Sequence, residues 1–204
     1  MEVPVNRIFE RRSINFFDPA RELEDSLLKE IIDLAANAPS AFNLQPWDII
    51  AVKSDEAKKK LHGLANQQPK ILEAPVTLIL SGDRSAYGDD NPQWSFMREN
   101  YGNDGAERAK GAASFLYGST EERKIKFAES NTGLLAMSIM YAAKSLGVDS
   151  HPMSGIDFEG IKTQFGLEGE KEVVMLIALG YFDEEKVLHS SAPRRRFESL
   201  VKIA

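Results

Sequence analysis

Apolar residues recur along this chain with two different spacings, and the spacing separates the expected helices from the expected strands. Repeats at three and four residues predict amphipathic helices, whereas short unbroken apolar runs are typical of strands buried on both faces. The expected helices are residues 5–10, 24–38, 55–64, a short piece ending at 73, 131–146 and 158–165, and the expected strands are 47–52, 76–80 and 173–179. Residues 148–153 lead into Ser154-Gly155 and are assigned to neither class.

Residues 131–146 have the strongest helical pattern and leave little polar surface. A helix of that kind is buried on most sides, in a core or at a subunit interface, and Gly147 suits its C-terminal cap. No internal repeat, low-complexity tract or interdomain linker divides the chain. We therefore expect one α+β domain over residues 1–204, with a single sheet sandwiched by helices.

The pattern weakens between Gly82 and Ser119, where aromatic residues lie among glycine, asparagine and charged residues. Such a segment is often a mobile, partly helical excursion, and an aromatic-rich one can cover a ligand site. The alternative, equally consistent with the sequence, is that the aromatic residues form a small core of their own. The residues concerned are Trp94, Phe96, Tyr101, Phe115 and Tyr117.

The stretch from Ala38 to Trp47 joins a helical pattern to a strand pattern and contains Pro39 and Pro46. Proline fixes its own φ and favours extended geometry in the residue before it, so Ala38 and Gln45 are expected to be extended. The result is a stiff connector that presents polar side chains at set positions. Local chemistry alone favours a plain loop whose side chains satisfy backbone groups.

The chain has 204 residues, of which 43% are hydrophobic and 27% charged, so it can bury one sizeable core. Its formal net charge of -6 argues against a nucleic-acid partner. Cysteine is absent, which excludes disulfides and thiolate metal sites. The first residues lack the apolar core of a signal peptide, and no apolar run is long enough to span a membrane. We expect a soluble cytoplasmic protein without a membrane partner.

The sequence contains no nucleophile elbow, phosphate-loop motif or Gly-x-Gly-x-x-Gly fingerprint. His62, His151 and His189 lie far apart without the spacing of metal ligands, so no metal site is expected. The carboxylates are scattered over expected helix faces. An enzyme with these residues would need a cofactor to supply its chemistry, and we assign no side chain a catalytic role.

Positive charge is concentrated in two places, Arg11-Arg12-Ser13 and Arg194-Arg195-Arg196. Two guanidinium groups beside a hydroxyl suit a phosphate monoester. Each cluster alone is more typical of solvated surface charge. Two separated clusters in an acidic protein nevertheless favour a small anionic ligand.

The order Arg-Arg-Ser near the N-terminus, then Ala-Pro-Ser-x-x-Asn-x-Gln-Pro-Trp after the first long helix, resembles the FMN-dependent nitroreductase family. The apolar helix at 131–146, the sequence His-Pro-Met-Ser-Gly at 151–155 and the arginine-bearing C-terminal arm agree with it. The resemblance covers most of the chain and is weakest over residues 83–128, which it identifies as a cap. It implies a central mixed or antiparallel sheet sandwiched by helices, with a long buried central helix. It also implies a homodimer with two FMN molecules at the subunit interface and NAD(P)H as reductant.

Carried over by position, the resemblance implies roles for the two basic clusters. Arg11 and Ser13 would hold the phosphate and ribityl chain of FMN, with Arg12 alongside. Arg194 would reach the same phosphate from the C-terminal arm. The residue Asn15, where many relatives carry a basic side chain, also belongs to the expected cofactor-binding set.

The resemblance assigns further residues to the isoalloxazine ring. Gln67 and Lys70 would meet its pyrimidine edge, where a cation favours the negative charge of reduced flavin. Backbone N–H groups of Ser154 and Gly155 would face flavin N5, although many relatives carry glutamate in place of Ser154. The residues expected to reach the flavin from the other subunit are Pro39, Ser40 and Asn43.

The function implied is an FMN-dependent NAD(P)H oxidoreductase that reduces small electron-poor acceptors, such as nitroaromatics or quinones, by hydride transfer through flavin N5. The alternatives are a specialised relative, such as a flavin reductase or reductive dehalogenase, and a flavin-binding or storage protein without turnover. The sequence leaves open the acceptor, the choice between NADH and NADPH, and whether Phe42 and Gln45 contact a ligand or only pack.

Overall fold

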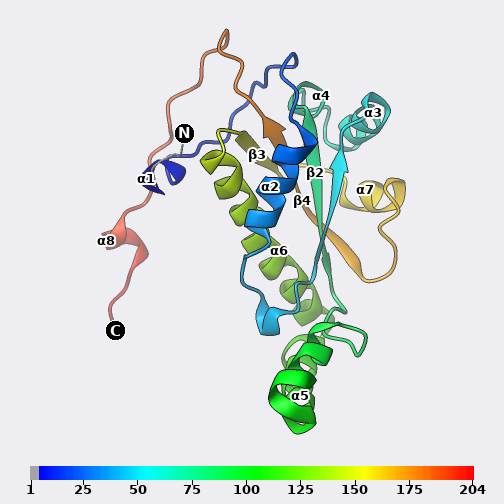
Figure 1. The fold of residues 1–204 in the computed structure, drawn as a ribbon. Helices are drawn as coiled ribbons and strands as arrows, with labels where there is room; N and C mark the ends of the chain where they lie inside the picture. Colours follow the sequence, from blue (N-terminus) through cyan, green and yellow to red (C-terminus); the bar gives the residue numbers. More distant parts are fainter. Residues whose placement is uncertain (1–4) are drawn as a thin grey trace.

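The computed structural model describes residues 5–204, and a four-stranded antiparallel sheet lies at its centre (Figure 1). The strands follow the order β1-β2-β4-β3, so β2 and β4 form the inner pair. Strands β1, β2 and β4 coincide with strands predicted from the sequence, whereas β3 lies in a segment that was left unassigned; the mixture of helices and strands confirms the α+β class. The strands are β1 (Trp47–Val52), β2 (Val76–Asp83), β3 (Asp149–Met153) and β4 (Lys171–Gly180).

The inner strands are covered on both faces, as their unbroken apolar runs predicted. Side chains alternate between the two faces of a strand, so sequence neighbours enter different cores. In β2, Leu78 and Leu80 belong to one hydrophobic core, whereas Ile79 belongs to the other. One sheet therefore separates two cores, and each core needs its own layer of helices.

Helices supply these layers on opposite faces of the sheet (Figure 1). One layer contains α2 (Asp25–Ala35) and α6 (Glu121–Ser145), and the other contains α3 (Asp55–Leu64), α4 (Lys70–Glu73) and α7 (Phe158–Gln164). Ile31 and Ile139 close the first core from α2 and α6. Leu61 and Ile161 close the second core from α3 and α7. This arrangement confirms the sheet sandwiched by helices.

Helix α6 is the long buried helix, but it begins at Glu121, ten residues before the predicted start at Asn131. The predicted start was wrong because six of the ten residues from Glu121 to Ser130 are charged, which leaves only a weak apolar pattern there. The helix begins there because Thr120 caps it, its hydroxyl accepting a hydrogen bond from the Arg123 N–H at 3.2 Å. Glu121 and Glu122 lie in the first turn, where the helix dipole favours negative charge.

Helix α5 (Gln93–Gly118) fills most of the segment where the sequence pattern weakened, and it is interrupted at Gly102, whose φ is 76°. Its aromatic residues divide into two groups. Trp94 is fully buried, and the ring of Tyr117 stacks on Phe127 of α6 at a centroid distance of 4.6 Å, so a small core exists here. The aromatic side chains that stay exposed are Phe96, Tyr101 and Phe115.

The connector between α2 and β1 contains a short 3-10 turn, η1 (Ala41–Asn43). The prediction that Gln45 is extended is wrong, because its φ is 48°. Its N–H donates to Ser40 Oγ at 3.0 Å, and its carbonyl accepts the Trp47 N–H at 2.8 Å. These local hydrogen bonds outweigh the preference for extended geometry that the following proline imposes.

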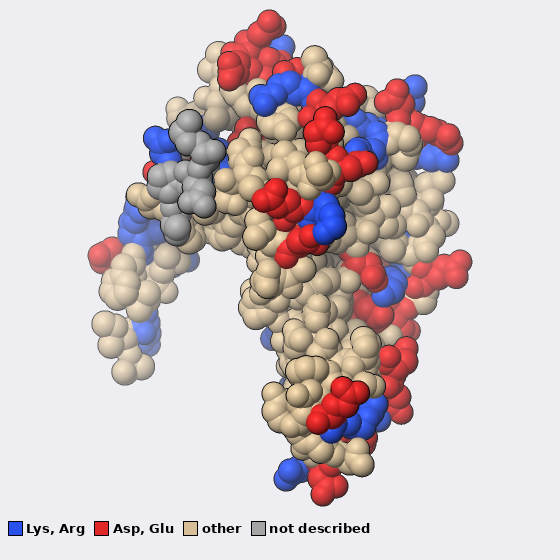
Figure 2. All heavy atoms as spheres, in the orientation of Figure 1, with Lys and Arg blue, Asp and Glu red and all other residues tan. Residues whose placement is uncertain are grey.

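The short helices α1 (Val5–Ile8) and α8 (Phe197–Leu200) lie on the same side of the molecule in Figure 1, beyond α6. The C-terminal arm, residues 193–204, extends away from the body of the molecule. A wide hollow therefore separates α8 from the body, whose surface facing the hollow is mostly uncharged (Figure 2). Within residues 5–204, no helix combines the length and apolar character needed to cross a membrane.

Candidate functional site

The N-terminal basic triplet and the start of the C-terminal arm meet at a pocket of about 310 Å³. Arg11, Arg12 and Ser13 line it from one side, and Arg194 lines it from the arm. Glu10 is the carboxylate residue in the lining. Four residues predicted from separate ends of the sequence are thus brought together, and their net charge favours an anion.

Arg11 is half-buried at the base of this arrangement. Its Nη1 lies 3.9 Å from Met140 Sδ on α6, and its Nη2 donates to Ser13 Oγ at 3.3 Å. Its Nε is buried and has no hydrogen-bond partner among the described residues. Burial lowers the pKa of Arg11, Tyr141 acts in the opposite direction, and the charge of Arg194 lowers it further. A desolvated cation with an unused donor is costly unless it meets an anion.

Carbonyl groups of the C-terminal segment hold the other two arginines. Arg12 Nη2 donates to the carbonyl of His189, and Arg194 Nη1 donates to the carbonyl of Ala192 at 2.8 Å. The first bond ties the triplet to the chain that leads into the arm. Both guanidinium groups keep further donors, because each has five N–H bonds.

The segment after the triplet is fixed to strand β3. Ser13 forms an isolated parallel bridge with Ser150, and the Ile14 N–H donates to the Ser150 carbonyl at 3.3 Å. His151 Nδ1 lies 2.6 Å from the Ile14 carbonyl, so Nδ1 donates its proton to that oxygen. The predicted Asn15 is exposed and does not line the pocket.

His151 links this pocket electrostatically to a second group of predicted residues. Burial lowers the pKa of His151, the Ile14 carbonyl opposes that effect, and the charges of Lys70 and Arg11 lower the pKa further. His151 therefore lies within the field of both cations. From the sequence, His151 was weighed as a metal ligand and was part of the His-Pro-Met-Ser-Gly motif, but no role at the site was predicted for it; its place just before Ser154 was the available signal.

The second group contains the predicted residues of the turn after α3 and of the turn after β3. Asn66 Nδ2 and Gln68 Nε2 both donate to the Gly155 carbonyl, at 2.9 and 3.2 Å. Lys70 Nζ in turn donates to Gln68 Oε1 at 3.4 Å. Burial lowers the pKa of Lys70, and the charge of Glu73 opposes that effect. The predicted residues in this group are Gln67, Lys70, Ser154 and Gly155.

The remaining predicted residues, Pro39, Ser40 and Asn43, lie apart from both the Arg11 pocket and the Lys70 group in the same chain. The Ala41 N–H donates to Asn131 Oδ1 on α6 at 2.9 Å, whereas Arg11 contacts Met140. Those α6 residues are nine positions apart (140 − 131 = 9), or roughly 13 Å along the axis at about 1.5 Å per residue. The predicted residues therefore fall into two separate groups within one chain.

Asn131 is a residue that sequence reasoning missed. It is buried, its Nδ2 donates to the Phe127 carbonyl at 2.6 Å, and its Oδ1 holds the loop through Ala41. A lone amide within an otherwise apolar helix was the available signal, because a buried polar group must find partners.

Comparison with known proteins identifies the family. The model of the Nitroreductase family matches residues 8–181. This chain belongs to the nitroreductase family. A Thermus thermophilus relative named NADH dehydrogenase is 33% identical over 182 residues, which are 86% of this chain and 84% of that protein. The CLA biosynthesis enone reductase of Lactiplantibacillus plantarum is 31% identical over 191 residues, 90% of this chain and 87% of the enzyme.

A solved structure extends the comparison to the whole nitroreductase fold. A protein from Exiguobacterium sibiricum, crystallised in complex with FMN, matches 99% of this chain with 98% of its own. The TM-score is 0.86 at 22% identity, a level at which the two proteins share their fold. The fold predicted from the nitroreductase resemblance is therefore confirmed.

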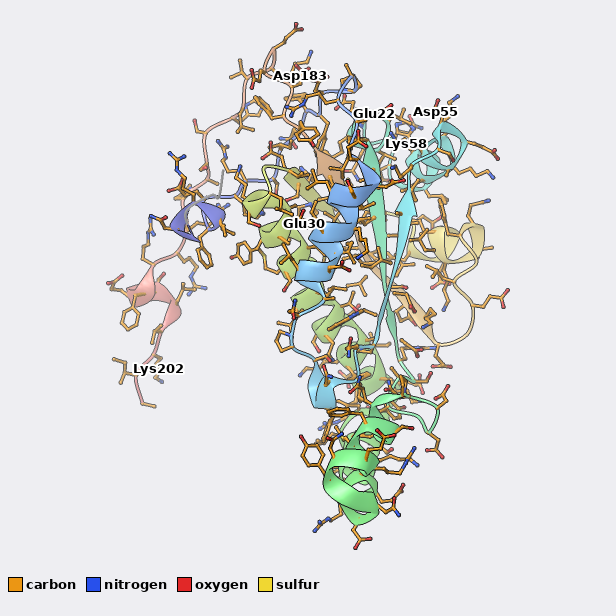
Figure 3. The ribbon with its side chains drawn as sticks, in the orientation of Figure 1. Glu22, Glu30, Asp55, Lys58, Asp183 and Lys202 are labelled. Carbon is orange, nitrogen blue, oxygen red and sulfur yellow. The ribbon has the colours of Figure 1, made fainter. Side chains whose placement is uncertain are left out.

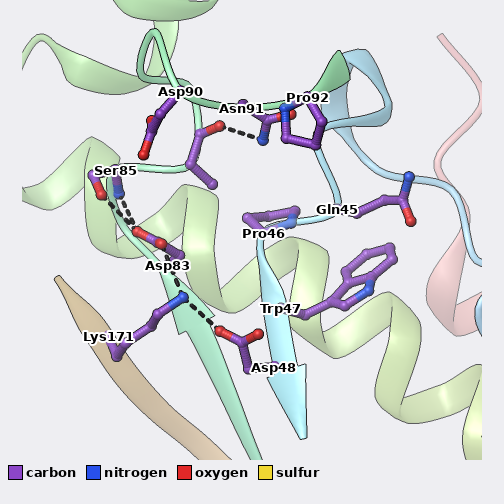
Figure 4. Close-up of a pocket in the computed structure, with 11 residues that line it drawn as sticks. Gln45, Pro46, Trp47, Asp48, Asp83, Ser85, Asp90, Asn91, Pro92 and Lys171 are labelled. Carbon is purple, nitrogen blue, oxygen red and sulfur yellow. Dashed lines mark hydrogen bonds and ion pairs between the residues drawn. The ribbon is translucent and has the colours of Figure 1, made fainter. Parts of the chain in front are cut away.

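This member of the nitroreductase family has another pocket, of about 200 Å³, beside the start of β1 (Figure 4). Lys171 Nζ lies there between Asp48 and Asp83, at 2.5 and 2.9 Å from their carboxylates. Burial acts to lower the pKa of Lys171, but hydrogen bonds to both carboxylates raise it. Lys171 is paired with both carboxylates and ties the start of β4 to β1 and to the end of β2. With Asp90 also in the lining, the pocket keeps a net negative charge, which does not suit the phosphate of a cofactor.

Proposed function

We propose that this protein is an FMN-dependent NAD(P)H oxidoreductase that reduces small electron-poor acceptors, such as nitroaromatics or quinones, by two electrons. The observation that supports it best is the half-buried Arg11, whose Nη groups contact Ser13 Oγ and Met140 Sδ and meet no carboxylate among the described residues. Arg11 shares its pocket with Ser13 and Arg194. A phosphate monoester in this pocket would neutralise the desolvated charge and accept hydrogen bonds from the remaining Nη donors.

The strip of cations from Arg11 past His151 to Lys70 fits the charge distribution of FMN. The phosphate is the anionic end of the cofactor, and the pyrimidine edge of the isoalloxazine ring becomes negative when the flavin is reduced. Arg11 lies at one end of the strip and Lys70 at the other, and both charges act on His151. We assign the phosphate to Arg11, Ser13 and Arg194, and the pyrimidine edge to Lys70.

The bound FMN would supply hydride transfer at N5, taking a hydride from NAD(P)H and delivering it to the acceptor. The residues of this chain bind and orient the cofactor. Lys70, whose pKa burial lowers, would stabilise negative charge on the ring. The turns at Gln67 and at Ser154-Gly155 are fixed to each other through the Gly155 carbonyl and would set the plane of the ring.

We further propose that the active form is a homodimer with an FMN at each of two equivalent interface sites. The half-site at Pro39, Ser40 and Asn43 is anchored to α6 at Asn131, away from Arg11 in the same chain, and we assign it to the flavin of the other subunit. The C-terminal arm extends away from its own body, with apolar side chains exposed, and Lys202 lies far from Glu30 of α2 (Figure 3). A second copy that filled the hollow beside the arm would complete the flavin site from the other subunit.

The relatives support the reductant, the acceptor class and the cofactor. Their names refer to an NADH dehydrogenase and an enone reductase, and the Exiguobacterium sibiricum structure contains FMN. An enone, like a nitroaromatic or a quinone, is an electron-poor acceptor of a hydride and a proton. An enone reductase is therefore the second candidate, since that relative matches 90% of this chain.

The decisive experiment is the visible absorbance spectrum of the purified protein, before and after NAD(P)H under anaerobic conditions. We expect a flavin spectrum that bleaches with NAD(P)H and returns when a quinone, a nitroaromatic or an enone is added. Protein that contains no flavin and fails to bind added FMN would refute the proposal. A flavin that stays oxidised with both NADH and NADPH would instead indicate a binding or storage protein. Acceptor turnover compared across quinones, enones, free flavins and halogenated aromatics would separate a general reductase from a specialised relative.

A further inference from the structure

The loop that contains Ser40 and Asn43 has an unusual backbone. Residues with positive φ are rare outside glycine, because Cβ then crowds the neighbouring carbonyl, and they persist where the surroundings over-determine them. The loop contains three such residues in four positions, Phe42, Asn43 and Gln45. The contacts that hold the loop therefore decide which atoms it presents.

One of these contacts is Asn91, in the chain just before α5 (Figure 4). Its Nδ2 donates to the Leu44 carbonyl at 3.0 Å and to the Ala86 carbonyl at 2.7 Å. Its Oδ1 accepts the Gln93 N–H at 2.9 Å. Asn91 thus fastens the loop, the turn after β2 and the first residue of α5 to one another.

Gln93 makes the contact that concerns the half-site itself. Its Oε1 accepts a hydrogen bond from Asn43 Nδ2 at 3.1 Å. The preceding Phe42 is held independently of Gln93, because its ring packs against those of Trp94 and Tyr117, with ring centroids 6.4 and 6.3 Å apart. Packing therefore fixes the backbone of the loop, whereas Gln93 orients the exposed amide of Asn43.

The orientation matters because the two ends of an amide have opposite hydrogen-bonding character. With Nδ2 directed to Gln93, Asn43 presents Oδ1 as an acceptor to whatever lies beyond the loop. We propose that Gln93 is a positioning residue for the flavin chemistry: by holding the Asn43 amide, it sets the atom offered to the isoalloxazine ring bound mainly by the partner subunit. This inference rests on the proposed function, in which Asn43 reaches that ring. Gln93 is the first residue of α5. The start of this helix then acts on the flavin through Asn43, whether or not α5 also covers the ligand.

The test compares FMN-loaded variants of the full chain. Gln93→Leu removes the acceptor at nearly constant size, Gln93→Glu keeps an oxygen that can accept from Asn43 Nδ2, and Asn43→Ala removes the group that is positioned. The double variant Asn43→Ala/Gln93→Leu completes a cycle. Gln164→Leu, at the end of α7, is the matched control, because Gln164 is exposed and α7 lies across the sheet from α6. The measurements are the anaerobic rate of flavin reduction by NAD(P)H, the visible flavin spectrum, bound FMN per chain and Tm.

We expect Gln93→Leu to slow flavin reduction about three- to tenfold, which is the rate effect of losing one hydrogen bond, and to shift the flavin spectrum. FMN content and Tm should match the Gln164→Leu control, and Gln93→Glu should restore most of the rate. The double variant should be no slower than Asn43→Ala alone. A merely structural role for Gln93 would lower Tm without this rescue or this non-additivity.

Three results would overturn the inference while leaving the proposed function intact. One is a normal reduction rate and spectrum in Gln93→Leu, and another is a loss that adds to that of Asn43→Ala. A fall in Tm well beyond that of Gln164→Leu, with equal rate losses in both Gln93 variants, would also contradict it. Failure of the unmodified protein to bind FMN or to be reduced would instead refute the proposed function itself.

Discussion

At the scale of single residues, Arg11 provides the sharpest test of the cofactor site. Arg11→Ala should weaken FMN binding by roughly 1.5–3 kcal/mol, the value of a hydrogen bond to a charged group, because the variant loses the charge and the Nη donors that line the pocket. Titration of flavin-free protein with FMN, followed by fluorescence, measures the change. Arg195→Ala is the control, since Arg195 does not line the pocket and bonds instead to the Ser199 carbonyl. Equal affinities in the two variants would contradict the phosphate assignment.

His151 gives a prediction about pH. Burial lowers its pKa below the ordinary 6.5, so the unfolded chain binds a proton more readily than the folded chain. Its contribution to stability is therefore complete above about pH 6.5 and is lost as pH falls through the lower folded pKa. Urea unfolding of flavin-free protein at pH 7.5 and 5.5 should reveal this loss. The variant His151→Asn, which keeps a donor for the Ile14 carbonyl, should lose less unfolding free energy between these two pH values.

A histidine replacement elsewhere controls for the general effect of acid. His62→Asn on α3 should retain the loss of unfolding free energy between the two pH values, since His151 is still present. If His151→Asn and the unmodified protein lost the same amount, desolvation of His151 would not be the cause. The groups that act on His151 are the Ile14 carbonyl, Lys70 and Arg11, so FMN-free protein is the proper state for this measurement.

The residues that could be predicted are those whose chemistry is local in the sequence. Arg11 and Ser13 are two positions apart, and a pair of guanidinium groups beside a hydroxyl indicates an anion before any fold is known. Asn131 and His151 could not be assigned in that way. Their partners, Ala41 and Ile14, lie 90 and 137 residues away, and only the fold brings them together.

At the scale of elements, the same distinction explains why strands were predicted better than the start of α6. A buried strand such as β2 is an unbroken apolar run, whereas the first turns of α6 are stabilised by a cap and by charge at the helix N-terminus. Thr120 followed by Glu121 and Glu122 was the available signal. The backbone of Gln45 could not be predicted, because its hydrogen bond to Ser40 competes with the ordinary preference of a residue before proline.

The contact between β2 and α6 gives a prediction at this scale. A Cβ on Gly82 would lie 2.7 Å from the Ala128 carbonyl oxygen, so strand and helix can approach only because the residue is glycine. Gly82→Ala should destabilise the protein by about 1–3 kcal/mol, the usual cost of overpacking. Gly111→Ala on α5, where nothing lies within 4 Å, should instead stabilise it by roughly 0.5–1 kcal/mol. Chemical denaturation of both variants tests the pair, and equal stabilities would contradict a tight strand–helix contact.

At the scale of the whole molecule, the antiparallel sheet could be predicted as a class but its strand order could not. Apolar runs identify the inner strands. Many strand orders would bury these runs equally well, however, until it is known which side chains share each of the two cores. The division of the predicted site into two half-sites also appears only in the fold, because it depends on where Arg11 and Ala41 meet α6. Because these two groups are separate in one chain, we propose that a second subunit brings them together.

The C-terminal arm tests that proposal. Phe197, Leu200, Val201 and Ile203 are 61%, 61%, 47% and 82% exposed, an unusual concentration of apolar side chains for a terminal segment that faces water. Each would contribute about 1.5–3 kcal/mol if a second copy buried it fully. Deleting residues 197–204 should therefore raise the dimer dissociation constant by at least about a hundredfold, even with partial burial.

Sedimentation velocity over a range of concentrations, with bound FMN measured in the same samples, follows both consequences of the deletion. The truncated chain should become more monomeric and should lose FMN as it does so, because Pro39, Ser40 and Asn43 then leave the flavin site of the other subunit. Phe158→Ser is the matched control: Phe158 is also exposed, but it lies on α7, across the sheet from α6 and the arm. A truncated chain that dimerised as tightly as this control would place the interface elsewhere. Loss of FMN from a protein that stayed fully dimeric would show instead that the arm serves the phosphate pocket directly, through the segment that positions Arg194.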